Sequence, residues 1–296
     1  MSLNFIKINK NKKYAELLGW QPSWFGCDLF DSFLIEKIKF FQAAHDLIVD
    51  GLCGPMTTRR LELEKDAEVI DVKEYVLCSG IKVPVPGTKI ITLDEKGALH
   101  LPESCYRKTF RKNPTMIVTH FDVALSAESC YRILKKRNIS SHFVIDNDGT
   151  IYQMVDTAYE AWHAGNRAVN KASIGIDISN AYYTKYNSRY EKMGFGKRPV
   201  LRDLKVHGQT LAECLGFYPQ QLEAYSRLVE TLCQHYNIPL EYPQDPSGAL
   251  LRGVYEDASK ARFKGIINHY HITKRKIDCV NLDLGKIIDQ LKNRVA

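Results

Sequence analysis

From residue 116 onward, short apolar runs alternate with amphipathic segments, and this pattern constrains the fold more than any other feature. Residues 116–121 (MIVTHF) and 173–179 (SIGIDIS) are typical of buried strands, whereas residues 127–137 and 220–236 have the spacing of helices that bury one face. A last strand is expected in residues 263–272 (FKGIINHYHI), before a C-terminal helix. Strands interleaved with helices predict an α/β domain with a central mixed β-sheet flanked by helices.

The chain divides into three parts by pattern. Residues 1–70 are expected to form a small helical domain, in which Asp31 or Ser32 caps the first clear helix and Gly54-Pro55 opens the next. Residues 71–115 contain short β-prone pieces, and Pro84 and Pro86 argue against a central strand there, which indicates a connector with an edge hairpin. Residues 116–296 form the α/β domain.

Composition excludes several classes of protein. The chain has 296 residues, 45% of them hydrophobic, and a formal charge of +7, which is typical of a globular protein and not of a disordered or fibrous chain. The mild basic excess favours an anionic partner such as a cell-wall polymer, but no Lys/Arg block predicts nucleic-acid binding. The sequence leaves the oligomeric state open.

The location of the chain can also be predicted. No run of about 18 apolar residues predicts a membrane span, and the first residues lack the apolar core of a secretory signal. The 8 cysteines have no metal-type spacing, which favours free thiols in a reducing compartment. We therefore expect synthesis in the cytoplasm of a bacterial host without a signal peptide.

Three segments carry polar groups where a buried strand does not need them. A period of two places His120 on one face of its strand and His269 with His271 on one face of the last strand. Asp278 follows in the segment TKRKIDC. Two imidazoles and a carboxylate are the ligand set of a catalytic zinc site with one open position. On spacing alone, however, satisfied core histidines account for the pattern as well.

Five blocks extend the argument beyond spacing. They are MIVTHF, SSHFVIDNDGTIYQMV, AWHAGN, SIGIDISN and INHYHITKRKIDC, in this order. Together they resemble the zinc-dependent N-acetylmuramoyl-L-alanine amidases, a family related to phage lysins and peptidoglycan recognition proteins. The resemblance spans roughly residues 116–290 and implies a mixed sheet flanked by helices, with zinc (Zn²⁺) at the base of a surface groove.

The resemblance also implies roles for individual residues. The implied zinc ligands are His120, His269 and Asp278. Lys276 matches the lysine that stabilises charge on the attacked carbonyl, and Asp177 occupies the place of a glutamate thought to act on the attacking water. His163, with Trp162 before it, matches a residue that lines the substrate cleft.

Several positions depart from the family pattern. Asp177 is one methylene shorter than glutamate, so for the same role either the backbone comes closer or a water intervenes. His271 stands where an acid is common, and either orients a ligand or replaces one. Cys279 follows Asp278 in place of proline and is an alternative third ligand. Tyrosines in residues 181–195 either form a sugar-binding wall or pack an inserted loop.

The first part has its own resemblance. The segment FFQAAHDLIVDGLCGPMTTRRL is similar to a three-helix peptidoglycan-binding domain. We therefore predict a peptidoglycan hydrolase that cleaves the amide between the lactyl group of N-acetylmuramic acid and L-alanine by zinc-activated water, and that is a phage or prophage endolysin. The alternatives are a non-catalytic peptidoglycan-binding protein and a phage-tail component that opens the wall.

Overall fold

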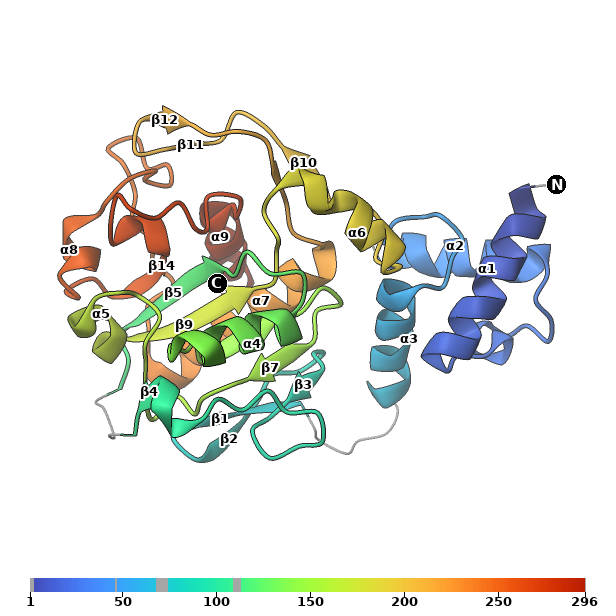
Figure 1. Cartoon of the computed structure of the whole chain (residues 1–296), viewed down its shortest axis with the longest axis horizontal. Helices are drawn as coiled ribbons and strands as arrows, with labels where there is room; N and C mark the ends of the chain where they lie inside the picture. The colour runs from blue at the N-terminus through green and yellow to red at the C-terminus, as the bar shows by residue number, and fades with distance from the viewer. Residues whose placement is uncertain (1–2, 46, 68–73, 109–112, 296) are drawn as a thin grey trace. The chain divides into compact units, whose positions relative to one another are not determined.

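A computed structural model describes residues 3–45, 47–67, 74–108 and 113–295. The chain forms two compact units (Figure 1). The first contains Met1–Asp71 together with Ser188–Lys197, and the second contains Val72–Asn187 together with Arg198–Ala296. The segment predicted as a connector from residue 71 to 115 thus falls in the second unit, apart from its first residue.

The first unit is helical, as predicted. It contains α1 (Leu3–Leu18), a short 3-10 helix η1 (Pro22–Phe25), α2 (Ser32–Ala44) and α3 (Pro55–Ala67). Asp31 caps α2, because its side chain accepts a hydrogen bond from the backbone N–H of Leu34 at 2.9 Å. One cluster in the core of this unit contains the buried residues Trp20, Cys27, Leu34, Ile38 and Cys53.

A later segment completes the first unit, which no local pattern in the sequence predicted. Helix α6 (Asn187–Lys192) and the residues after it pack with the N-terminal helices. Gly194 has φ of +84°, and a Cβ there would lie 3.1 Å from the ring of Tyr14 and 3.2 Å from Pro55. Glycine therefore permits both the left-handed backbone and the close approach.

The second unit is built on the predicted mixed sheet. The six strands lie in the order β14 (Gly265–Asn268), β5 (Met116–Phe121), β9 (Ser173–Ile178), β6 (Phe143–Ile145), β7 (Ile151–Gln153) and β3 (Ile90–Ile91). All neighbouring pairs are parallel except β6 and β7, which form an antiparallel hairpin around Asn147-Asp148-Gly149.

Helices cover both faces of this sheet (Figure 1). Helices α7 (Pro219–Tyr236) and α9 (Leu284–Val295) pack on the face that carries Ile117 and Ile174. Helix α4 (Ala127–Arg137) packs against Val144, on the other face. The alternation of the strands thus directs His120 and Asp177 away from α7, as their spacing predicted.

Smaller elements surround the sheet. Short antiparallel pairs are β1 (Tyr75–Cys78) with β2 (Ile81–Pro84), β4 (Tyr106–Arg107) with β8 (Glu160–Ala161), β10 (Val200–Leu201) with β13 (Cys214–Leu215), and β11 (Lys205–Val206) with β12 (Gln209–Thr210). The remaining helical turns are η2 (Glu103–Cys105), α5 (Arg167–Ala172), η3 (Thr184–Tyr186), α8 (Glu256–Ser259) and η4 (His269–His271). Among the described helices, none has the length and apolar character needed to cross a membrane.

One predicted element is shorter than expected. Strand β14 ends at Asn268, and His269–His271 form the 3-10 turn η4. The prediction that His269 and His271 share a strand face was therefore wrong. In a 3-10 turn, successive side chains point in different directions, so these two histidines have separate surroundings.

Candidate metal and catalytic site

Three neighbouring strands bring the candidate site together. In the parallel pair β5 and β9, His120 lies opposite Asp177, so both side chains leave the sheet on the same face. In the pair β14 and β5, Asn268 lies opposite Thr119, and His269 therefore follows beside His120. Asp278 reaches the same point from the loop after η4.

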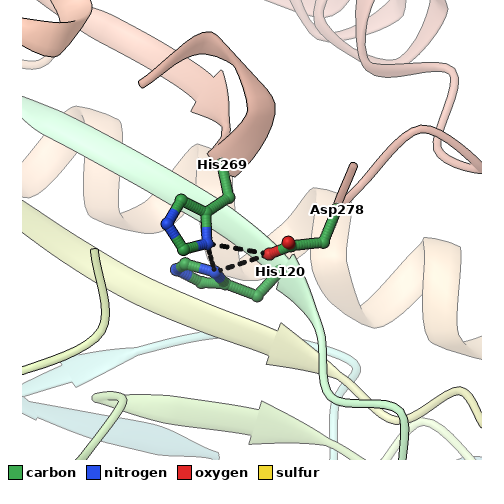
Figure 2. Close-up of side chains that lie close together, drawn as sticks. All are labelled: His120, His269 and Asp278. Atoms are coloured by element: carbon green, nitrogen blue, oxygen red, sulfur yellow. Dashed lines mark hydrogen bonds and ion pairs between the residues drawn. The ribbon is translucent and has the colours of Figure 1, made fainter. Parts of the chain in front are cut away.

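The two histidines and Asp278 form a compact buried cluster (Figure 2). The Nδ1 atoms of His120 and His269 are 3.0 Å apart, and they lie 3.0 Å and 2.9 Å from Oδ2 of Asp278. Ligands about 2.0–2.1 Å from a tetrahedral zinc ion lie roughly 3.3 Å from one another. The donor set and its spacing therefore fit a zinc ion, the cofactor implied by the sequence.

Charge within the cluster favours an ionised carboxylate. Burial acts to raise the pKa of Asp278, but its close contacts with His120 and His269 outweigh burial and hold this pKa far below its usual range. Burial lowers the pKa of His269, although Asp278 opposes that effect. Neutral imidazole and ionised carboxylate are the forms that bind metal ions.

Asp177 lies next to the cluster and has a raised pKa. Burial raises the pKa of this carboxyl to about 7, with a further contribution from Asp278, while Ser141 and the charges of His269 and Lys276 oppose the shift. A carboxyl with a pKa near neutrality can both accept and return a proton at working pH. This property suits the acid/base role that the sequence suggested for Asp177.

The sequence analysis missed a second carboxyl at the same place. Asp122 lies two residues after His120, and burial together with the charge of Asp177 raises its pKa to about 7. Its oxygens accept hydrogen bonds from the backbone N–H groups of Ala124 and Asn180 and from the hydroxyl of Ser179. These bonds fix Asp122 beside Asp177. The only signal in the sequence was an acid at the exit of a buried strand.

The cluster opens into a cavity of about 160 Å³. Its walls include Trp162, His163, Asp177, Arg137 and Lys276. Lys276 is exposed, and its charge is close enough to lower the pKa of Asp177. The structure thus brings all seven predicted site residues to one cavity: His120, Trp162, His163, Asp177, His269, Lys276 and Asp278.

The sequence offered His271 and Cys279 as alternative metal ligands. Among the described residues, neither belongs to the cluster of candidate ligand atoms. His271 is buried, and its Nδ1 accepts from the backbone N–H of Asn268 while its Nε2 donates to the carbonyl of Leu251. It contacts none of the candidate ligands through these bonds. Cys279 is buried in the apolar core, and burial raises the pKa of its thiol, which disfavours the thiolate.

Two tyrosines of residues 181–195 pack into the protein, whereas Tyr183 is 52% exposed. Tyr182 is buried and stacks on Phe121, with 4.8 Å between ring centroids, and Tyr190 is also buried. None of the described residues that line the cavity belongs to residues 181–195. These contacts favour the packing alternative over a sugar-binding wall.

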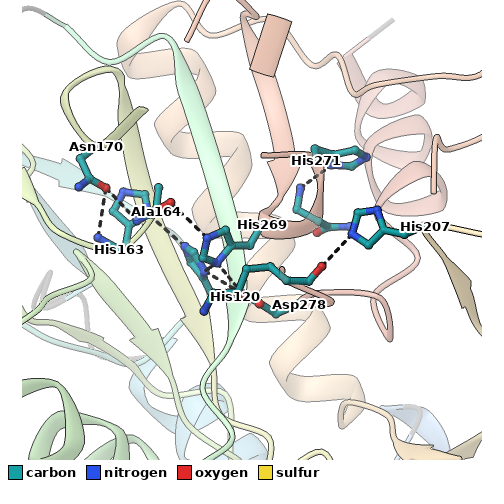
Figure 3. Close-up of polar contacts among 10 residues, drawn as sticks. His120, His163, Ala164, Asn170, His207, His269, His271 and Asp278 are labelled. Carbon is teal, nitrogen blue, oxygen red and sulfur yellow. Dashed lines mark hydrogen bonds and ion pairs between the residues drawn. The ribbon is translucent and has the colours of Figure 1, made fainter. Parts of the chain in front are cut away.

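The outer nitrogens of both candidate ligands are also bonded (Figure 3). Nε2 of His120 lies 3.0 Å from Nδ1 of His163, and Nε2 of His269 lies 3.3 Å from the carbonyl oxygen of Ala164. On the opposite side, Nε2 of His207 donates to the carbonyl of Lys276 at 2.9 Å. The sequence assigned no role to His207, because a hairpin histidine far along the chain gives no local signal.

A mixed sheet with polar side chains gathered in a cavity at the carboxyl ends of its parallel strands defines an α/β enzyme. The family model for N-acetylmuramoyl-L-alanine amidases matches residues 110–280. This match covers more than half of the chain, and the chain belongs to that family. Its activity is that of an N-acetylmuramoyl-L-alanine amidase.

Solved structures give a weaker likeness. The endolysin amidase LysCS from Clostridium intestinale is 18% identical, covers 69% of this chain and 95% of its own, and has a TM-score of 0.40. The amidase AmiD from E. coli is 17% identical, covers 74% of this chain and 66% of its own, and has a TM-score of 0.39. None of the curated proteins compared with the chain matches it. The assignment therefore depends on the family model.

Proposed function

We propose that this chain is a two-part peptidoglycan hydrolase that cleaves the amide between the lactyl group of N-acetylmuramic acid and L-alanine with the help of zinc. The observation that carries the proposal is the convergence of His120, His269 and Asp278 in one cavity of an amidase-family domain. These three residues would hold the ion.

Zinc, when bound, would lower the pKa of a coordinated water towards about 7 and polarise the carbonyl. The protein supplies the remaining chemistry. Asp177 accepts a proton from the attacking water and later delivers it to the leaving amine. Lys276 places an ammonium group where negative charge develops on the carbonyl oxygen. Trp162, half-buried in the cavity wall, provides an apolar surface for the substrate.

The first unit is proposed to hold peptidoglycan. Helices α2 and α3 and the segment between them carry the residues of the binding-domain pattern, from Phe41-Gln42 to Thr57. Tethering to an insoluble polymer raises the local concentration of cleavable bonds, so even a weak anchor can increase the rate on intact wall. A wall anchor joined to an amidase suits an endolysin that acts on the wall of a bacterial host.

The reaction is tested by mass spectrometry of purified peptidoglycan after digestion. We expect peptide stems beginning with L-alanine to appear with the wild-type chain, and to disappear when a chelator removes the metal. Readdition of zinc should restore the products. Cleavage that is complete in the presence of chelator would remove zinc from the proposal, and release of other fragments would change the bond assigned.

The biological role needs a separate test. If the chain is an endolysin, it should accumulate late in infection, lyse the host from within, and be missing from purified virions. If it is a tail component that opens the wall during infection, it should be found in purified virions by mass spectrometry.

A further inference from the structure

We infer that His163 and Ala164 fix both candidate zinc-binding histidines in the form that binds metal, and that His163 acts as a positioning residue for His120. This inference rests on the zinc site proposed above and deepens it. Hydrogen bonds lead outward from the cluster to His163 and Ala164, and all the residues concerned lie in the second unit.

The first step concerns the hydroxyl of Ser173, which has one proton to donate. The hydroxyl lies 2.6 Å from the carbonyl oxygen of Val169, which can only accept. The proton of Ser173 is therefore committed to Val169. Nε2 of His163 lies 3.2 Å from the same hydroxyl oxygen, so His163 must donate its Nε2 proton to Ser173.

The second step follows for the other nitrogen of that ring. A neutral imidazole with a proton on Nε2 has a free lone pair on Nδ1. Nδ1 of His163 lies 3.0 Å from Nε2 of His120, so His120 donates and His163 accepts. The proton of His120 is thereby held on Nε2, and its Nδ1 presents a lone pair towards His269 and Asp278.

The third step gives the same result for the second ligand. Nε2 of His269 lies 3.3 Å from the carbonyl oxygen of Ala164. A carbonyl oxygen only accepts, so the proton of His269 is also held on Nε2. Adjacent residues of one loop thus orient both imidazoles. Metal-bound histidines commonly donate their second nitrogen in this way, and loss of such a partner typically weakens metal binding by about 10–100-fold.

The loop itself is held in place on two sides (Figure 3). The side-chain oxygen of Asn170 accepts from the backbone N–H of His163 at 3.2 Å and from that of Ala164 at 2.8 Å. On the sheet, a Cβ at Gly175 would lie 2.7 Å from the ring of His163. Glycine in the middle of β9 therefore leaves the room that this ring occupies, which accounts for a residue that otherwise weakens a strand.

These bonds change the role expected for His163. The sequence suggested a residue that lines the substrate cleft, and the ring does line the cavity. Its two nitrogens, however, are bonded to His120 and Ser173. A hydrogen bond from His163 to the substrate would break this chain of bonds, so its contribution is made through His120.

The test measures zinc affinity of the full chain, stripped of metal and titrated with zinc alone against a chromogenic chelator. His163→Phe keeps a ring of similar shape and removes both nitrogens. His163→Asn removes the ring and retains an oxygen close to the position of Nδ1. We expect a 10–100-fold weaker zinc affinity for His163→Phe and a change of less than about 5-fold for His163→Asn. The exposed His100→Phe is the matched control and should bind as wild type.

A spectroscopic measurement separates positioning from packing. In the zinc-loaded chain, the Nε2 proton of His120 should give a hydrogen-bonded, slowly exchanging resonance in wild type and in His163→Asn. It should be lost in His163→Phe. Ser173→Ala, which contacts neither ligand through the bonds described, should weaken zinc binding about 3–10-fold by acting through His163.

Other outcomes overturn the inference. If His163→Phe binds zinc as wild type and only KM rises, His163 is a substrate contact. Wild-type zinc affinity in His163→Phe together with a loss in His163→Asn would mean that the ring acts by packing. If His163→Phe does not fold, Ser173→Ala becomes the test. Wild-type zinc affinity in Ser173→Ala would then overturn the inference. If the wild-type chain itself binds no zinc, the proposed zinc site fails, and the inference fails with it.

Discussion

The two units each bury a polar centre, and the two centres differ in how they are satisfied. In the first unit, Gln42 is 2% exposed, and its amide nitrogen lies within 3.1 Å of acceptors on Asp50, Leu52 and Thr57. Its oxygen accepts from the backbone N–H of Gly51 at 2.8 Å. Donors meet acceptors throughout, so this centre needs nothing from outside the protein.

The centre in the second unit is different. Two imidazole nitrogens and a carboxylate oxygen face one another within about 3 Å, and the outer nitrogens of both rings already donate elsewhere. Three lone pairs directed to one point repel each other unless a cation or protons lie between them. A sequence motif can therefore mark a centre whose polar groups satisfy one another, as at Gln42, or a cluster of ligand atoms suited to a cation, as at His120. Predictions follow from this difference.

The largest effect is expected for His120→Ala. Removing one of three ligands should abolish stable zinc binding and lower amidase activity by roughly 10³-fold or more, because the metal and the orientation of the substrate are lost together. Metal content after dialysis and release of L-alanine stems measure the two effects. His100→Ala, exposed in the same unit, should change neither. Activity that survives His120→Ala would place catalysis elsewhere.

Asp177→Asn is expected to lower kcat by roughly 10²–10⁴-fold while zinc remains bound. The ionised carboxylate is the active base, so activity of the wild type should rise with pH as Asp177 loses its proton, with a limb at or below about pH 7. A bound cation lowers this value, because it favours the charged form. The pH profile of kcat provides the measurement, and Asp177→Glu should keep the limb. An unchanged profile in Asp177→Asn would remove this residue from the mechanism.

The sequence predicted much of this site, because alternation in a strand is fixed by geometry. Once residues 116–121 and 173–178 are strands, the faces of His120 and Asp177 follow. The order of strands in a sheet does not follow from local pattern, and only the family resemblance indicated that these residues meet. The end of β14 before His269 was also beyond prediction, since a strand and a 3-10 turn share the same apolar composition.

What the sequence could not predict depends on contacts between distant residues. The hydrogen bonds of His163 connect residues 120, 163 and 173, and no local spacing encodes them. The assignment of Ser188–Lys197 to the first unit has the same character, since that segment follows 116 residues of the second unit beginning at Val72. Asp122 was visible in the sequence, but burial beside Asp177 gives it significance, and burial belongs to the folded chain.

Lys276→Ala should have a smaller effect, about 10²-fold on kcat, because one stabilising charge is lost while the ligands remain. Lys276 is exposed, so neither zinc affinity nor folding should change. Lys276→Arg keeps the charge and should recover part of the activity. Kinetics on a defined muropeptide measure the effect. A rise in KM alone, with kcat unchanged, would assign Lys276 to substrate binding instead.

The smallest effect on amidase activity is expected for Gln42→Leu. This change tests the buried polar centre of the first unit, where the side chain of Gln42 is hydrogen-bonded within the protein. It leaves the buried N–H of Gly51 and the acceptors on Asp50 and Thr57 without their partner, at a cost of about 2 kcal/mol in the free energy of unfolding. In a Trp162→Phe background, the remaining tryptophans, Trp20 and Trp24, both belong to the first unit, so fluorescence in urea reports on that unit alone.

The control for Gln42→Leu is Glu36→Leu on the same helix, where an exposed side chain should cost less than about 0.5 kcal/mol. With Trp162 intact, Gln42→Leu should cleave a small soluble muropeptide at the wild-type rate, because the catalytic cluster lies entirely in the second unit. Its rate on intact wall should fall if the first unit is the anchor. If the first unit is shown to be unfolded and the variant still cleaves both substrates at the wild-type rate, the proposed anchoring role is contradicted. The amidase assignment would remain intact.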